Sequence, residues 1–214
     1  MRLFLLLSLV ATAAAAQERQ LVDEVVAVVD AHSVTLSELA AETRIRMVEQ
    51  QGPQMASVPL DRAILAASLR RLVEERIVLS EVERLKLFDL DKAEVESALA
   101  RLRARFPTPT AWEAFARQLE MTSDEVAAVL ARELRVARYL DNRLKLAAQL
   151  RESELDEAWK AQGGQGDREA LRQKLSKEKY ERMLTELLAE LRRRASVRIV
   201  DPLGDATRSI AERP

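Results

Sequence analysis

The chain has 214 residues, of which 48% are hydrophobic, and 34 Lys and Arg nearly balance 35 Asp and Glu. This balance lacks the basic excess typical of nucleic-acid-binding proteins, so we expect no nucleic-acid partner. The absence of Cys excludes disulfides and thiol chemistry, and a single His excludes a metal site built from several imidazoles.

The first sixteen residues have the three-part pattern of an export signal. Arg2 supplies a positive charge, residues 3–10 are almost entirely apolar, and small residues follow. Ala14 and Ala16 fit an A-x-A cleavage site, so we expect cleavage near Ala16–Gln17 and removal of residues 1–16. The apolar run is too short to span a bilayer. We therefore expect an exported protein with no integral membrane segment after cleavage.

A strand and a capped helix are predicted next. Residues 25–29 form a β-branched run that is apolar on both faces, which is typical of a buried strand. The four residues that follow read as a turn containing His32, the only imidazole. We interpret His32 as a turn residue and not as a catalytic base, which would need an oriented partner and a nucleophile. Thr35 and Glu38 have the spacing of a capping box, which predicts a helix over 37–51.

An apolar stripe at helical spacing predicts a long helix from after Pro59 to about residues 87–88. Its carboxylates alternate with arginines, which favours ion pairs on the helix surface over acid–base catalysis. The residues concerned are Arg70, Arg71, Glu74, Glu75, Arg76, Glu81, Glu83 and Arg84.

Four more pairs with box-like spacing predict further helix starts. The first of these helices should end near Phe106–Pro107, and the last should be short and end at a glycine-rich tract. The pairs are Asp91 with Glu94, Thr110 with Glu113, Thr122 with Glu125, and Ser153 with Asp156.

Residues 162–167 contain three of the five glycines and are predicted to be a flexible linker. A phosphate loop or a calcium loop is disfavoured here, because the flanking residues lack the spacing that either motif needs. A long helix over 168–194 and a strand over 197–199 follow, and residues 202–214 are predicted to be a flexible tail. If 25–29 pairs with 197–199, the two ends of one domain close a small sheet.

The fold class that follows is mainly α, a multi-helix domain over residues 17–201 with a small sheet made by the N-terminal and C-terminal strands. The order of elements resembles the core of the SurA-type periplasmic chaperones, folding factors linked to parvulin prolyl isomerases. Residues 22–39, 115–140 and 184–200 carry the resemblance, which covers the chain to about residue 201. In that family a parvulin domain usually precedes the last helix. Here residues 160–168 occupy its place, and so short a segment cannot fold alone.

The resemblance therefore implies a chaperone core without the isomerase domain. It implies an ATP-independent periplasmic chaperone that is not an enzyme and needs no cofactor, metal or nucleotide. Its expected partners are unfolded polypeptides, in particular the precursors of outer-membrane proteins. The alternatives are a structural or assembly subunit that binds one envelope partner, and a peptidyl-prolyl isomerase with a minimal site.

Apolar residues suited to varied client segments are the candidate binding residues, because Met is adaptable and aromatic rings are flat and rigid. At helical spacing the same residues can equally belong to the packed core. The candidates are Trp112, Phe115, Met121, Trp159 and Met183.

Overall fold

The computed structural model describes residues 23–86 and 89–200. Within them the chain is mainly helical with one small antiparallel sheet, which confirms the predicted fold class. The expected export signal and C-terminal tail lie outside the described residues. The elements in chain order are β1 (Val25–Val29), β2 (His32–Thr35), α1 (Leu36–Gln51), the 3-10 helix η1 (Pro53–Ser57), α2 (Arg62–Arg84), α3 (Lys92–Arg103), α4 (Pro109–Gln118), α5 (Ser123–Leu144), α6 (Glu152–Ala161), α7 (Arg168–Arg194) and β3 (Val197–Ile199).

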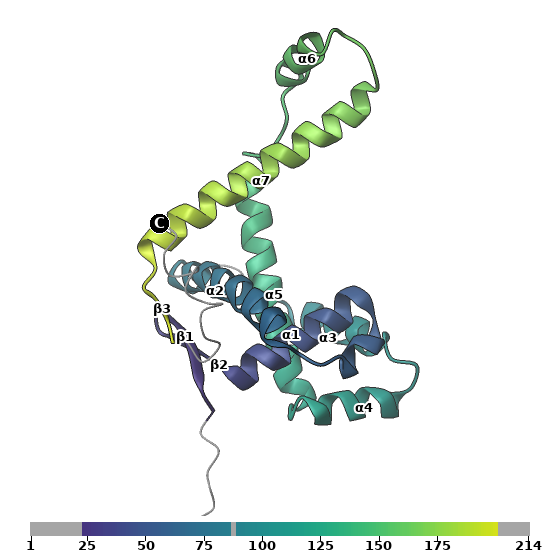
Figure 1. Ribbon diagram of the computed structural model, residues 1–214, viewed down its shortest axis with the longest axis vertical. Helices are drawn as coiled ribbons and strands as arrows, with labels where there is room; N and C mark the ends of the chain where they lie inside the picture. Colours follow the sequence, from purple (N-terminus) through teal and green to yellow (C-terminus); the bar gives the residue numbers. More distant parts are fainter. Residues whose placement is uncertain (1–22, 87–88, 201–214) are drawn as a thin grey trace, which may run out of the picture.

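The sheet joins the two ends of the described chain. Its strand order is β2-β1-β3, and both pairings are antiparallel. Val29 lies opposite His32 on one side and Val197 on the other. The expected pairing of 25–29 with 197–199 is therefore confirmed (Figure 1).

The turn prediction at His32 is wrong, because His32 begins β2. The turn consists of Asp30 and Ala31 alone, and Asp30 has a positive φ of 51°. A four-residue strand has little signal of its own, and β2 exists because β1 supplies its hydrogen-bonding partners. His32 also places its Nε2 atom 2.9 Å from a carboxylate oxygen of Glu83, which ties the strand to α2.

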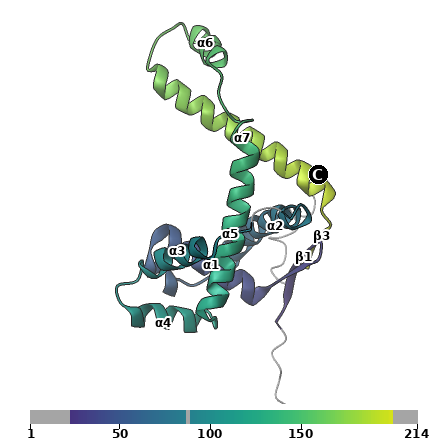
Figure 2. The ribbon, with the colours of Figure 1, turned by 180° about the vertical axis from the view of Figure 1, so that it is seen from behind.

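Two hydrophobic clusters form the interior, and α1 and α5 pass through both. The first core joins the sheet to α2, the second half of α5 and the C-terminal half of α7. The second core joins the second half of α1 to α3, α4 and the first half of α5. Figures 1 and 2 show α5 as a long stem that rises from α4 toward α7.

A helical arm, made of α6 and the N-terminal half of α7, projects from this body (Figures 1 and 2). Leu155 and Leu171 are buried within it, and the glycine tract makes the turn at its tip. Gly163, Gly164 and Gly166 there have positive φ angles, a conformation that costs glycine little. The other half of α7 packs against α2.

Most predicted helix starts are confirmed by their caps, and two are corrected. Thr108, not Thr110, caps α4, and its hydroxyl accepts from the N–H of Ala111. Helix α6 begins after Arg151, where Glu154 accepts from the Arg151 N–H, so Ser153 is not its cap. The boxes at Thr122 and Asp91 and the cap at Thr35 form as expected.

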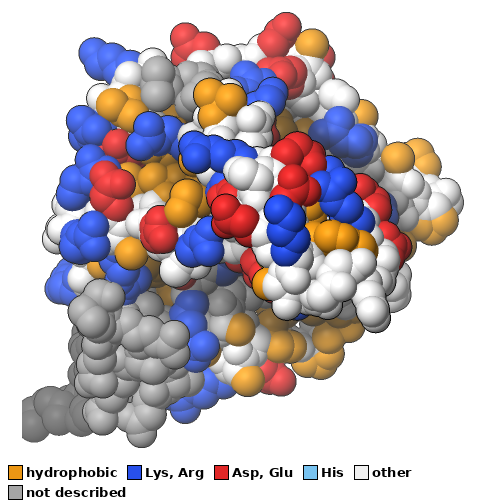
Figure 3. Space-filling view, turned by 90° about the horizontal axis from the view of Figure 1, so that it is seen from above, with side chains coloured by type: hydrophobic (Ala, Val, Ile, Leu, Met, Phe, Trp, Pro, Cys, Tyr) orange, Lys and Arg blue, Asp and Glu red, His pale blue; other side chains and the backbone are white. Residues whose placement is uncertain are grey.

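Charged side chains of both signs are intermixed on the face seen from above, with only small apolar patches between them (Figure 3). Such mixing is typical of solvated helix faces. Across residues 23–86 and 89–200, no helix combines the length and the apolar character needed to cross a bilayer.

Candidate functional site

The connection between α3 and α4 gathers three aromatic rings. The ring centroids of Phe106 lie 5.7 Å from Trp112 and 5.0 Å from Phe115, and the last two rings are 6.0 Å apart. Phe106 and Trp112 meet edge to face, an arrangement that aromatic quadrupoles favour. Pro109 occupies the first helical position of α4, where its missing N–H has no cost, and so fixes the direction in which α4 leaves this cluster.

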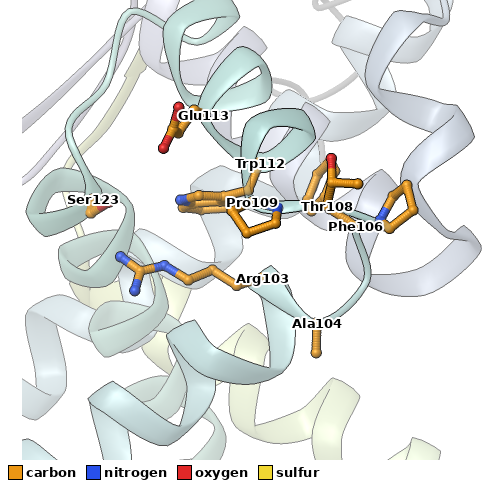
Figure 4. A pocket seen from close by; sticks show the side chains of 9 residues that line it. Arg103, Ala104, Phe106, Thr108, Pro109, Trp112, Glu113 and Ser123 are labelled. Carbon is orange, nitrogen blue, oxygen red and sulfur yellow. The ribbon is translucent and has the colours of Figure 1, made fainter.

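An open hollow of about 570 Å³ lies against the aromatic cluster (Figure 4). The guanidinium of Arg103 stands 5.4 Å from the centroid of the Trp112 ring, a cation–π contact. In Figure 4 this guanidinium and the indole nitrogen of Trp112 point to the same side of the hollow, toward Ser123. The lining residues are Arg103, Ala104, Phe106, Pro107, Thr108, Pro109, Trp112, Glu113 and Ser123.

The hollow offers both an apolar wall and polar groups. Its wall is made of proline rings and the accessible edges of two aromatic rings, which favours contact with an apolar side chain. Arg103 donates hydrogen bonds, and the carboxylate of Glu113 accepts them. A peptide backbone carries one donor and one acceptor per residue, so an extended segment can satisfy both kinds of group.

A second hollow, of about 350 Å³, lies between α1 and the start of α5. Its apolar lining includes Leu119, Met121 and Val129. The two hollows border the same turn between α4 and α5, since Met121 lines one and Ser123 lines the other. The polar residues that line the second hollow are Ser37, Glu38, Glu42, Glu120, Glu125 and Arg132.

The five candidate residues do not form one surface. Trp112 and Phe115 are buried in the second core, although Trp112 also lines the first hollow. Met121 packs at the edge of the same core and lines the second hollow. Trp159 lies half-buried on the arm, and Met183 packs half-buried against the first core. Of the five, Trp112 and Met121 are the residues that border one of these two hollows.

Sequence reasoning missed Arg103, Phe106 and Ser123 as site residues. Phe106 and Pro107 were interpreted only as the end of a helix, and that helix in fact ends at Arg103. The available signal was the dense spacing of an aromatic residue, two prolines and Trp112 within seven positions. Such a segment cannot be helical throughout, so it must turn and bring its rings together.

A buried charged layer, which we name the seam, separates the two cores where α1, α2 and α5 meet. Its first half centres on Arg76, whose side chain is only 5% exposed. Arg76 Nη2 lies 2.8 Å from an oxygen of Glu38 and 2.7 Å from one of Glu42, and Arg132 of α5 also binds Glu42. The expectation that Arg76 pairs on the surface of its own helix is wrong, since its partners belong to α1.

The second half of the seam centres on Arg46. Its Nη2 atom donates hydrogen bonds to a carboxylate oxygen of Glu75 at 2.7 Å and to one of Glu133 at 2.8 Å. Glu75 also accepts a hydrogen bond from Arg71 at 2.7 Å, which confirms the prediction of an ion pair between these two residues of α2. The pKa of Glu133 is raised to about 7. Burial is the main cause, Arg46 acts in the opposite direction, and the nearby carboxylates, Glu49 among them, add to the rise.

Among the described residues, no three His, Cys, Asp or Glu side chains are grouped in a way that could hold a metal ion. The chain matches no model of a known protein family, and it matches no curated protein at a significant level. What it does must therefore be inferred from the hollows and from the resemblance noted in the sequence.

Proposed function

We propose that this protein is an ATP-independent, chaperone-like binding protein of the periplasm. It covers apolar segments of unfolded envelope proteins, among them precursors of outer-membrane proteins, until those proteins fold or insert. The two hollows beside the α4–α5 turn are the proposed contact sites. The predicted export signal and the resemblance to SurA-type chaperone cores motivate the location and the class of client.

One observation supports this function above the others: the hollow beside Trp112 is open and mainly apolar, yet polar at its rim. Apolar side chains of a client can enter it, while Arg103 and Glu113 engage the client backbone without reading its sequence. Contacts of this kind are individually weak, so a client can be released without an energy source. Adaptable Met121 in the neighbouring hollow suits segments of varied shape.

The proposal is tested by aggregation of a denatured outer-membrane protein diluted into buffer with increasing amounts of the purified protein. We expect light scattering to fall at near-stoichiometric ratios without ATP. Ser123→Trp places a large ring at the mouth of the first hollow and should weaken suppression several-fold. Ala114→Trp is the matched control, because Ala114 is exposed on α4 and lines neither hollow.

Site-specific crosslinking from position 123 separates this function from its alternatives. Many unfolded clients support the proposal, whereas one folded partner supports a dedicated assembly subunit. A measurable acceleration of prolyl isomerisation in a short peptide would instead support the isomerase. Absence of both suppression and client crosslinks would overturn the proposed function.

A further inference from the structure

Strand β3 forms one edge of the sheet, because β1 lies between it and β2 (Figure 1). The residues that flank β3 show which way its backbone groups point. The carbonyl of Ser196 accepts a hydrogen bond from the residue that follows β1, and the N–H of Val200 donates to β1. Backbone groups alternate in direction along a strand, so those of Arg198 point toward β1 as well. The N–H and C=O groups of Val197 and Ile199 therefore point away from the sheet.

These four outward groups accept or donate no hydrogen bond within residues 23–86 and 89–200. Among the elements of that part of the chain, β1 is the one with which β3 makes extensive contact. A row of unpaired donors and acceptors along an edge strand is a template for one more strand. The ligand that matches it is a polypeptide in an extended conformation, since a helix already uses its own backbone groups.

The side chains of β3 decide which extended segment fits best. Val197 and Ile199 pack half-buried against the first core, and Arg198 is exposed on the opposite face. On an added strand, the side chain directly across from Arg198 lies about 5 Å away, where a carboxylate is favoured and a cation is disfavoured. The residues beside Val197 and Ile199 extend the apolar face. The edge therefore favours a segment that alternates apolar and polar residues and carries an acid opposite Arg198.

Two strands that this protein could itself supply fit less well. When the β3 edges of two copies pair in the register that uses all four outward groups, Arg198 faces the Arg198 of the second copy, and like charges across a pair are destabilising. Residues 201–205 read DPLGD, the Pro and Gly spacing of a three-residue hairpin loop. A return strand in that register would set Arg208 opposite Arg198 and the polar Thr207 and Ser209 on the apolar face.

We propose that the β3 edge is a strand-addition site for extended segments of unfolded envelope proteins, in which apolar and polar residues alternate and a carboxylate faces Arg198. Strands of outer-membrane barrels have this alternation. Bonds to the client backbone need no particular sequence, which suits varied clients, and Arg198 adds a preference by charge. The identity of the client rests on the proposed function, whereas the edge itself depends only on the sheet.

Amide hydrogen exchange on the purified protein tests the edge directly. The N–H of Arg198 points into the sheet and should exchange slowly, while those of Val197 and Ile199 should exchange quickly. The probe is a nine-residue peptide that alternates valine with threonine, has glutamate at its centre and carries Gly-Ser at both ends for solubility. At saturation it should slow exchange at Val197 and Ile199 by about tenfold or more and leave Arg198 little changed.

Two variants test the backbone and the charge separately. Val197→Pro removes an outward N–H and no bond to β1, which an edge strand tolerates, and should weaken peptide binding about tenfold. Val197→Thr keeps the N–H and the side-chain shape and is its matched control. The wild type should prefer the glutamate peptide over one with a central lysine by about twofold to tenfold, and Arg198→Glu should reverse this preference. Arg193→Glu makes the same charge change at an exposed position of α7 and should leave the preference as it is.

The exchange measurement on the wild type also decides between the possible occupants and needs no variant to fold. Slow exchange at Val197 and Ile199 without peptide would overturn the proposal, because the edge would already be covered. Such protection would identify a second copy if it rose with protein concentration, and residues 201–214 if it did not. Exchange that the peptide leaves unchanged would overturn the proposal as well.

The same data separate strand addition from the proposed function. If the peptide protects Val197 and Ile199 but a denatured outer-membrane protein still aggregates, the chaperone function fails and the strand-addition site stands. If aggregation is suppressed and Val197→Pro suppresses it as well as Val197→Thr does, the chaperone function stands and its clients do not use this edge.

Discussion

The two cores are closed in different ways. The first is sealed by β1 and β3, which come from opposite ends of the described chain, and its buried residues are mostly aliphatic. The second is built from the end of α1 and from α3, α4 and the start of α5, of which the last three are consecutive in the sequence, and it holds the aromatic cluster. Both interiors are apolar. The second core borders the hollow of about 570 Å³ beside its aromatic rings, whereas the hollow against Ile77 and Leu191 of the first core is smaller, about 330 Å³.

This difference separates two tasks. Bringing distant segments into contact costs more loop-closure entropy than bringing neighbouring segments together. The first core therefore depends on the whole chain being present. Most of the second core comes from the consecutive helices α3, α4 and α5, and it can present its rings at a surface without exposing the joint between the chain ends. The seam is what makes the two cores one unit, and the predictions below act on that comparison.

The largest loss of stability is expected when the most buried ion pair of the seam is broken. Arg76→Met leaves Glu42, whose side chain is 4% exposed, with Arg132 as its remaining cation. Removing one partner of a buried ion pair costs about 3–5 kcal/mol. Denaturant unfolding should show a loss of this size in both cores. Arg71→Met, at the more exposed edge of the seam, should cost under about 1 kcal/mol and serves as the control.

A more local loss of stability, of similar or smaller size, is expected when a large side chain is removed from one core at a time. Phe115→Ala and Leu69→Ala remove buried side chains of the second and first cores and should each cost about 2–5 kcal/mol. Hydrogen exchange should speed up mainly in α3 and α4 for Phe115→Ala, and mainly in β1 and α7 for Leu69→Ala. Equal acceleration everywhere for both variants would show that the cores do not differ as described.

The smallest loss of stability is expected from a substitution on the arm, which belongs to neither core. Arg168 pairs with Glu152 and Asp156, and all three side chains are exposed. Exposed pairs of this kind contribute about 0–1 kcal/mol, so Arg168→Ala should leave the denaturation midpoint almost unchanged. Trp159 fluorescence should respond to the variant and to added salt, while Trp112 should not. A large shift in the midpoint would mean that the arm supports the cores.

Local structure could be predicted well where a signal is carried by neighbouring residues. Thr122 with Glu125 marks a helix start because both partners of the capping box lie within one turn. The 168–194 helix has long apolar periodicity between a glycine tract and the residues of β3, so both of its ends were predicted. By contrast β2 was missed, because a four-residue strand is defined by the partner strand that it pairs with.

The sequence by itself determined the helices and the strand at each end, because hydrophobic periodicity, caps and β-branched runs act over a few residues. Only the tertiary structure decided which charges are buried and where the hollows open. Arg76 follows Glu42 by 34 positions, and nothing near either residue reveals that they meet. Their burial arises from three helices crossing at one layer, and a crossing is a property of the packed chain.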